Sequence, residues 1–153
     1  MRSDTRERAR RQLDGLLSRL GGKDRPSTPP KGWIRAIRNA LGMSGRQLAA
    51  RLGVRPQSID AMEKSEARGK ISLETLQRAA DALDCTLVYA LVPKTSLEDS
   101  VQRRARRIAQ HDLRRVAHSM ALEDQATSDS DTEARIEDYI RNVLKDRDLW
   151  NGP

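Results

Sequence analysis

The chain has 153 residues, a length that fits one compact domain or a domain of roughly 60 residues with helical extensions. That length excludes a large catalytic core. Charged residues make up 33% of the chain, the formal net charge is +7, and two Trp, two Tyr and no Phe supply few bulky groups for a deep core. The longest apolar run, Leu87 to Val92, is far shorter than the roughly 20 residues that span a bilayer, and the first residues lack an apolar signal stretch. We therefore expect a cytoplasmic protein, packed mainly by Leu, Ile, Val and Ala.

The positive charge is unevenly distributed. Residues 1–93 hold 18 Lys and Arg against 10 Asp and Glu, and residues 94–122 hold 7 against 3. Residues 123–153 hold 4 against 9, so this last part is acidic. An excess of basic residues favours binding to phosphates through counterion release, although it is also common on proteins that are merely soluble.

The first predicted element is a helix from Ser3 to Leu20, followed by a linker. Four leucines share one side of this helix: Leu13, Leu16, Leu17 and Leu20. Gly21 and Gly22 end it, and Lys23 to Pro30 contains three prolines, which do not continue a helix. We expect a boundary near residue 30, with residues 1–30 forming an N-terminal helix and linker.

Four short helices are predicted next. The first covers Gly32 to Leu41; the second covers Gly45 to Leu52, with Ser44 as its cap and Gly53 after its end. Pro56 suits the first turn of the third helix, where its missing N–H costs nothing. Ser72 begins the fourth, whose apolar stripe is Leu73, Leu76, Ala80 and Leu83.

The run from Thr86 to Pro93 is rich in strand-forming residues. It predicts a short strand at about 86–92, and the alternative is the buried end of a helix. A single strand in a helical chain has no partner of its own, so we expect it to pair with the same strand of a second subunit. The expected assembly is a homodimer.

Two further helices are predicted after this strand. The first, Ser96 to Gln125, carries arginines over much of its surface, and the second covers about Thr132 to Lys145. Trp150 is expected to pack back onto the body of the protein. Residues 94–153 then form a C-terminal helical region that binds a partner, beside a DNA-binding domain at 31–93.

The DNA assignment rests on a helix-turn-helix motif, which needs a short helix, a tight turn with glycine, and a helix whose first residues reach base edges. The segment from Ser44 to Glu63 meets these requirements in order. Over about Gly32 to Leu83 the chain resembles the Xre/Cro/C1 repressor family through Leu48, Ala49, Leu52, Gly53, Val54, Ile59 and Glu63. The resemblance implies an all-α fold and binding to double-stranded operator DNA. Gly45 and Pro56 stand where that family often has Gln, so its base preference cannot be transferred.

The leading edge of the third helix holds the predicted base-reading residues: Arg55, Gln57, Ser58 and Ala61. An Arg side chain suits guanine and a Gln side chain suits adenine, whereas capping or a solvated surface is the alternative for Arg55 and Ser58. Residues 31–70 hold 9 basic and 3 acidic groups, so phosphate contacts are assigned to Arg38, Ser44, Arg46, Arg51 and Lys64. In a homodimer, two such helices about 34 Å apart predict a palindromic site.

The pattern of the whole chain is similar to the family called mobile mystery protein A. The similar segments are Ser65-Glu66 with Ile71 to Leu76, then Leu87 to Pro93, then His118 to Gln125. This resemblance implies a neighbouring protein with a Fic domain, an enzyme type that transfers AMP from ATP to protein hydroxyls. The chain is then expected to be the antitoxin of that Fic toxin and the repressor of their shared operon. The alternative is a dimeric regulator with no Fic partner.

Ser119 and Glu123 are the candidate inhibitory pair. Helices that block Fic sites have Ser or Thr, three residues, Glu, and then Gly or Asn; Asp124 departs from the last position. The resemblance implies that Glu123 pairs with an arginine of the Fic site. Four residues of separation place both side chains on one helix face. The alternative is an exposed glutamate in the last turns of a helix.

Nothing in the sequence indicates an enzyme, a cofactor or a metal site. Cys85 is the single cysteine, cannot form an internal disulfide and is expected to be a small buried residue. His111 and His118 have no ligand pattern around them. No glycine-rich phosphate loop or pairing of nucleophile and base is present.

Overall fold

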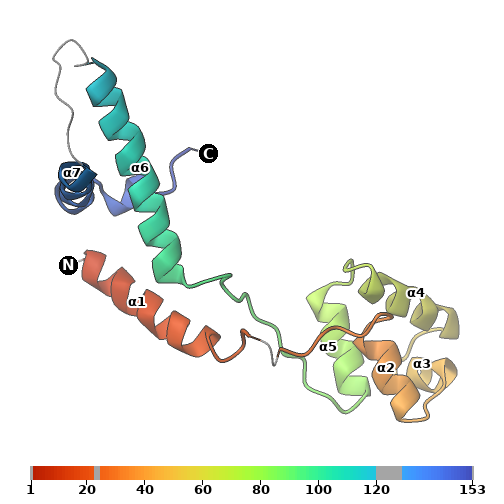
Figure 1. The fold of residues 1–153 in the computed structure, drawn as a ribbon. Coiled ribbons are helices and arrows are strands. Elements are labelled where there is room, and N and C mark those ends of the chain that lie inside the picture. Colours follow the sequence, from red (N-terminus) through yellow and green to blue (C-terminus); the bar gives the residue numbers. More distant parts are fainter. Residues whose placement is uncertain (1, 23–24, 120–128, 153) are drawn as a thin grey trace. The chain divides into compact units, whose positions relative to one another are not determined.

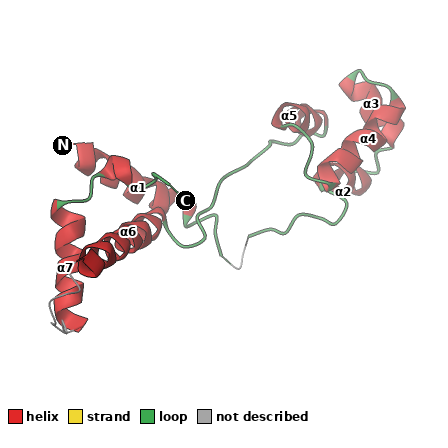
Figure 2. Cartoon of the chain, turned by 90° about the horizontal axis from the view of Figure 1, so that it is seen from above, coloured by secondary structure: helices red, strands yellow, loops and turns green. Residues whose placement is uncertain are grey.

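The structure is a computed structural model that describes residues 2–22, 25–119 and 129–152. The chain folds into two compact units. We call Asp24–Ala90 the central unit, and Met1–Lys23 together with Leu91–Pro153 the terminal unit. All regular structure in the described residues is helical, which confirms the all-α fold (Figure 1 and Figure 2).

The central unit consists of four helices: α2 (Trp33–Ala40), α3 (Gly45–Leu52), α4 (Pro56–Ala67) and α5 (Leu73–Ala82). Each contributes to one apolar core, whose fully buried members are Ile34, Leu48, Ala49, Ile59, Ala79 and Leu83. Leu48 is completely buried, and such a side chain contributes about 2–3 kcal/mol to folding. The predicted stripe of the fourth helix is wrong at Leu73, which is exposed because it lies at the first position of α5.

The starts of two central helices are fixed by serine caps, as predicted. The Ser44 hydroxyl accepts a hydrogen bond from the Gln47 backbone N–H, while the Gln47 side chain accepts one from the Ser44 N–H. The Ser72 hydroxyl accepts in the same way from the Thr75 N–H. These bonds satisfy N–H groups that the helices themselves leave without acceptors.

The strand predicted at 86–92 is absent from the structure, and so is the alternative of a continuing helix. Residues 85–93 have no regular secondary structure. A strand needs a neighbouring strand to receive its backbone hydrogen bonds, and the described part of this chain offers none. The segment is therefore an irregular connection in the single chain.

The terminal unit combines elements from both ends of the chain: α1 (Arg2–Leu17), α6 (Leu97–Ser119), α7 (Asp129–Asn142) and the short 3-10 helix η1 (Asp146–Asp148). Among the residues of this unit that the structure describes, the buried apolar ones are Ala105, Ala109, Ile136 and Leu149. Figure 2 shows α1, α6 and α7 close together. Among the described residues, none of the helices combines the length and the apolar composition that a membrane span needs.

Two predictions for the terminal unit are wrong in detail. Of the four leucines predicted to share one side of the first helix, Leu13, Leu16 and Leu20 are exposed, and Leu20 lies beyond the end of α1 at Leu17. Trp150, expected to pack inward, is exposed while the neighbouring Leu149 is buried. The predicted end of α6 near Gln125 lies outside the described residues.

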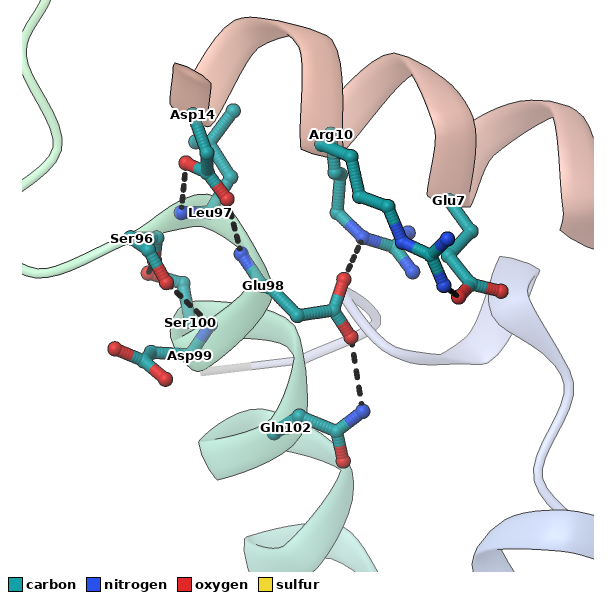
Figure 3. Close-up of polar contacts among 10 residues, drawn as sticks. Glu7, Arg10, Asp14, Ser96, Leu97, Glu98, Asp99, Ser100 and Gln102 are labelled. Atoms are coloured by element: carbon teal, nitrogen blue, oxygen red, sulfur yellow. Dashed lines mark hydrogen bonds and ion pairs between the residues drawn. The ribbon is translucent and has the colours of Figure 1, made fainter. Parts of the chain in front are cut away.

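Polar contacts join α1 to α6 (Figure 3). Asp14 accepts hydrogen bonds from the backbone N–H groups of Leu97 and Glu98, at 2.7 and 3.2 Å, and so caps α6 from another helix. Arg10 forms an ion pair with Glu98 at 2.7 Å. The hydrogen bond from Gln102, followed by that from Arg10, lowers the pKa of Glu98 below its ordinary value.

Contacts between α6 and α7 are also largely polar. The Tyr139 hydroxyl donates to Asp112 at 2.5 Å, and this bond lowers the pKa of Asp112. Arg106 pairs with Glu133. Arg104 donates to the backbone carbonyl of Leu149 at 2.7 Å and thereby holds the segment after α7 in place.

Candidate nucleic-acid interface

The turn between α3 and α4 is short and depends on glycine. Gly53 has φ 66°, in the left-handed region where a side chain is strained. The Val54 N–H donates to the Ala49 carbonyl at 3.0 Å, which closes the end of α3. Arg55 is extended, and Pro56 then begins α4 with the backbone angle that a first helical turn requires. The two helices pack directly against each other.

The rear of α4 is anchored inside the central unit. Ile59 and Glu63 lie one turn apart, and both are buried. Glu63 forms an ion pair with Arg38 of α2, with Nε–Oε1 at 2.6 Å and Nη2–Oε2 at 3.3 Å. Arg38 also donates to the Met43 carbonyl at 2.9 Å. These side chains are only 6% and 14% exposed for Glu63 and Arg38, so the pair fixes the orientation of α4.

The front edge of α4 faces away from this anchor. We use the name front edge for Arg55, Gln57, Ser58 and Ala61, all of which are exposed. Arg55 precedes the helix and forms no side-chain cap bond. The front edge is therefore accessible, as its proposed contact with bases requires, while the contacts themselves stay predictions.

The residues predicted to contact phosphates have different surroundings. Arg46 is exposed, and no bond or ion pair ties its side chain to another described residue. Arg51 donates to the Ala82 carbonyl at 2.8 Å, and Lys64 pairs with Asp60 at 2.6 Å on the surface of α4. The Ser44 hydroxyl is engaged as a helix cap. Arg38 is held in its ion pair with Glu63, so a phosphate contact from Arg38 would require that pair to open.

Glu66 has a structural role that the sequence reading missed. Its carboxylate accepts from the backbone N–H groups of Trp33 and Ile34, at 2.7 and 3.0 Å, and so caps α2 from α4. Gly32 lies against it with φ 86°, and a Cβ there would come within 2.6 Å of the Glu66 carboxylate. The available signal was the absence of a Ser, Thr, Asp or Asn cap before Trp33.

The predicted Fic-inhibitory pair lies only partly within the described residues. Ser119 is the last residue of α6; it is exposed, and its hydroxyl donates to the Arg115 carbonyl at 3.0 Å. Glu123 lies outside the described residues. The geometry of the pair therefore stays a prediction.

Comparison with known protein families gives one match. Residues 34–89 match the family described as helix-turn-helix, and this range covers α2, α3, α4 and α5. No match was found among curated proteins or among solved structures. The matched range contains the anchored α4, its exposed front edge and the glycine turn. The central unit is a helix-turn-helix domain of the Xre/Cro/C1 type, the domain of DNA-binding transcriptional regulators.

Proposed function

We propose that the central unit binds operator DNA with the front edge of α4 in the major groove. The observation that carries this proposal is the contrast between the two sides of α4. Ile59 and Glu63 hold the rear, and the opposite side presents exposed polar groups at the start of the helix. Arg55 is suited to guanine O6 and N7, and Gln57 to adenine N6 and N7. Ser58 and Ala61 complete the contact surface.

Contacts with the phosphate backbone of the DNA are assigned to exposed basic groups around the front edge of α4. Arg46 lies in the first turn of α3 and has its guanidinium free for a phosphate. Arg51, Lys64 and Ser44 would contribute after exchanging or sharing their present partners. Such contacts fix the register of the protein on the duplex and make the affinity fall with salt.

Substitution of Arg55 and Gln57 by Ala tests the base contacts. Each variant is expected to lose about 1–3 kcal/mol, or roughly 5- to 150-fold, of affinity for a duplex selected from random DNA. Fluorescence anisotropy at fixed salt measures this loss, and repeated selection measures the change in base preference. Arg68→Ala is the matched control, because Arg68 is exposed at the opposite end of α4. Unchanged affinity and preference in both front-edge variants would contradict the proposal.

Arg46→Ala tests the phosphate assignment separately. Affinity should fall by a similar factor for selected and unrelated duplexes, since a phosphate carries no sequence information. The slope of log K against log salt should decrease by about 1. An unchanged slope would remove Arg46 from the interface and leave the base contacts standing.

We further propose that the chain binds DNA as a homodimer that represses its own operon and inhibits a Fic-domain toxin. The resemblance of the whole chain to mobile mystery protein A favours this second function, and the exposed position of Ser119 is compatible with it. Glu123 would pair with the arginine of the Fic site and displace the ATP γ-phosphate. A gene for a Fic protein next to this one favours the antitoxin, and an isolated gene favours the stand-alone regulator.

Co-expression with the neighbouring Fic protein tests the inhibitory role. Glu123→Gly should release AMP transfer to protein hydroxyls, measured by labelling with α-labelled ATP. Asp124→Gly is the control, because Gly is acceptable at that position of the motif and inhibition should persist. If AMP transfer stays absent with the Glu123→Gly variant, inhibition would be assigned to another part of the chain.

A further inference from the structure

A tryptophan near the end of the terminal unit is exposed although its backbone is held in place. The Trp150 side chain is 63% exposed, whereas the neighbouring Leu149 is buried. The guanidinium of Arg104 donates to backbone carbonyls on both sides of the indole, those of Leu149 at 2.7 Å, Asn151 at 3.2 Å and Gly152 at 3.3 Å. These bonds present the apolar ring of Trp150 to solvent on a fixed backbone.

A hollow of about 340 Å³ lies between this segment and one face of α6. Its walls are formed by Ser100, Arg103, Arg104, Arg107, Trp150 and Gly152. The three arginines follow Ser100 by three, four and seven positions, so the four side chains share one face of the helix. Small-ligand sites typically measure about 300–1,000 Å³. The hollow therefore has room for one small molecule.

The charged groups that line this hollow, among the described residues, are all positive. The exposed side chain of Arg107 forms no ion pair or hydrogen bond with another described residue. Arg103 donates to the Thr95 hydroxyl, a neutral acceptor, at 2.9 Å. Asp99 and Asp148 are near in sequence, but neither lines the hollow. Two guanidinium groups are thus available to an anion, and their fork of N–H donors matches the oxygens of a phosphate.

We propose that this hollow binds a free mononucleotide, with its phosphate on Arg103 and Arg107 and its base against the indole of Trp150. A ligand that has both an anionic group and a planar ring is the one that uses both features of the hollow. Bases of every kind stack on aromatic side chains, so Trp150 selects for a base without selecting which one. Arg104 is a positioning residue, because it holds the backbone that carries the indole.

The size of the hollow favours a free nucleotide over a nucleic-acid strand. Domains that bind single strands cover about 4–16 nucleotides along a continuous groove, which is far more than this hollow accommodates. All of the residues that line it belong to the terminal unit. The inference is therefore independent of the proposed DNA contacts of the central unit, and its test contains no duplex DNA.

Nuclear magnetic resonance of the full chain tests the stacking on Trp150. The chain has two tryptophans, Trp33 in the central unit and Trp150 in the terminal unit, so its nitrogen–proton correlation spectrum has two indole N–H signals. Loss of one signal in Trp150→Phe assigns both. AMP and GMP, titrated separately, should shift the Trp150 signal with a Kd below about 1 mM. The Trp33 signal should stay in place and serves as the internal control.

Substitutions measured by calorimetry at low salt separate the contacts with phosphate and base. Arg103→Ala and Arg107→Ala should each weaken AMP binding at least about tenfold, because a charge-assisted bond to the phosphate is lost. Trp150→Ala should weaken it at least about fivefold through lost stacking. Arg115→Ala is the matched control, because Arg115 is exposed on the same helix but does not line the hollow, and its affinity should be nearly unchanged. Circular dichroism checks that the helices remain.

Ligands that lack one part of a nucleotide complete the test. Adenosine and inorganic phosphate should each bind at least about tenfold more weakly than AMP, because each loses one of the two contacts. Inorganic phosphate that binds as tightly as AMP, or an equal loss of affinity in Arg115→Ala, would overturn the inference and leave only general attraction of anions to α6. A Trp150 signal that neither nucleotide shifts above about 1 mM would also overturn it. The same holds for a short single-stranded oligonucleotide that shifts this signal at lower concentrations than AMP, which would assign the hollow to a strand.

Discussion

Each of the two units is stabilised internally by a different kind of interaction. The central unit buries six apolar side chains from four helices around one core. Among its described residues the terminal unit buries four, two of them alanines, and joins its helices mainly through carboxylates, arginines and a tyrosine hydroxyl. Apolar burial is insensitive to pH and salt, whereas exposed ion pairs and charged caps depend on both. The DNA-binding unit should therefore be the more robust half.

This difference has a functional meaning. The proposed base contacts of the front edge would need a rigid support, which the core and the Arg38–Glu63 pair provide. If the terminal unit binds the proposed partner, its fewer buried contacts leave it free to gain stability from that partner. Amide hydrogen exchange followed separately in α4 and α6 distinguishes the two units.

The largest expected effect is in the central core. Leu48→Ala removes a completely buried side chain and should lower the free energy of unfolding of the central unit by about 3–4 kcal/mol. Exchange in α3 and α4 should accelerate accordingly, while exchange in α6 should not change. Equal acceleration in α6 would show that the two units unfold together.

The buried ion pair is expected to contribute nearly as much. Glu63→Ala leaves the Arg38 guanidinium without its carboxylate in a largely buried position and should cost about 3 kcal/mol. Arg38→Met with Glu63→Leu removes both charges and should recover most of this loss. The urea midpoint measures all three proteins. No recovery in the double variant would mean that the charges are needed for the orientation of α4.

A smaller effect is expected at the junction of α1 and α6. Asp14→Ala removes the acceptor for two N–H groups and should cost about 1 kcal/mol, seen as faster exchange in the first turn of α6. Asp14→Asn keeps a side-chain acceptor and should cost less. Central-unit exchange serves as the internal reference in both variants. A change in amide exchange confined to α4 would contradict the expected role of Asp14 in the terminal unit.

The smallest expected effect is a difference between the two units in their sensitivity to acid. Hydrogen bonds from Gln102 and Arg10 lower the pKa of Glu98, and the Tyr139 hydroxyl lowers that of Asp112. A lowered folded-state pKa stabilises above the unfolded value, and this contribution is lost as pH falls through the folded value. Between about pH 6 and pH 3, the protection of the α6 amides, taken relative to the exchange of an unstructured chain at the same pH, should therefore fall toward acid. Glu98→Gln should flatten this dependence, and an unaltered slope would remove Glu98 as its source.

The elements that follow from local sequence could be predicted. Ser44 and Ser72 cap helices that begin at the next residue, and Gly53 forms the turn directly after α3, as predicted. The exposure of the front edge could be predicted from helical periodicity, because Ile59 marks the buried side of α4. Each of these features depends on residues only a few positions apart.

Contacts between distant residues could not be predicted in the same way. Glu66 caps α2 from 32 and 33 positions away, and Asp14 caps α6 from 83 and 84. Arg38 resembled a free surface arginine because its partner, Glu63, is 25 positions along the chain. Helical periodicity carries no information on which distant carboxylate reaches a given N–H or guanidinium. Residues 85–93 form no strand in the single chain, because a strand depends on a pairing partner outside the local sequence, and the predicted pairing with a second subunit stays a prediction.

Along the sequence, the central unit lies between α1 and α6, and this order has a consequence for synthesis. A ribosome that adds about 5–20 residues per second needs several seconds or more to proceed from Asp14 to the amides it caps, 83 and 84 positions later. All of α2 to α5 has been translated by then, so the DNA-binding domain is the first part that can fold. An interrupted chain ending after α5 would keep this domain and lack the helices that complete the other unit.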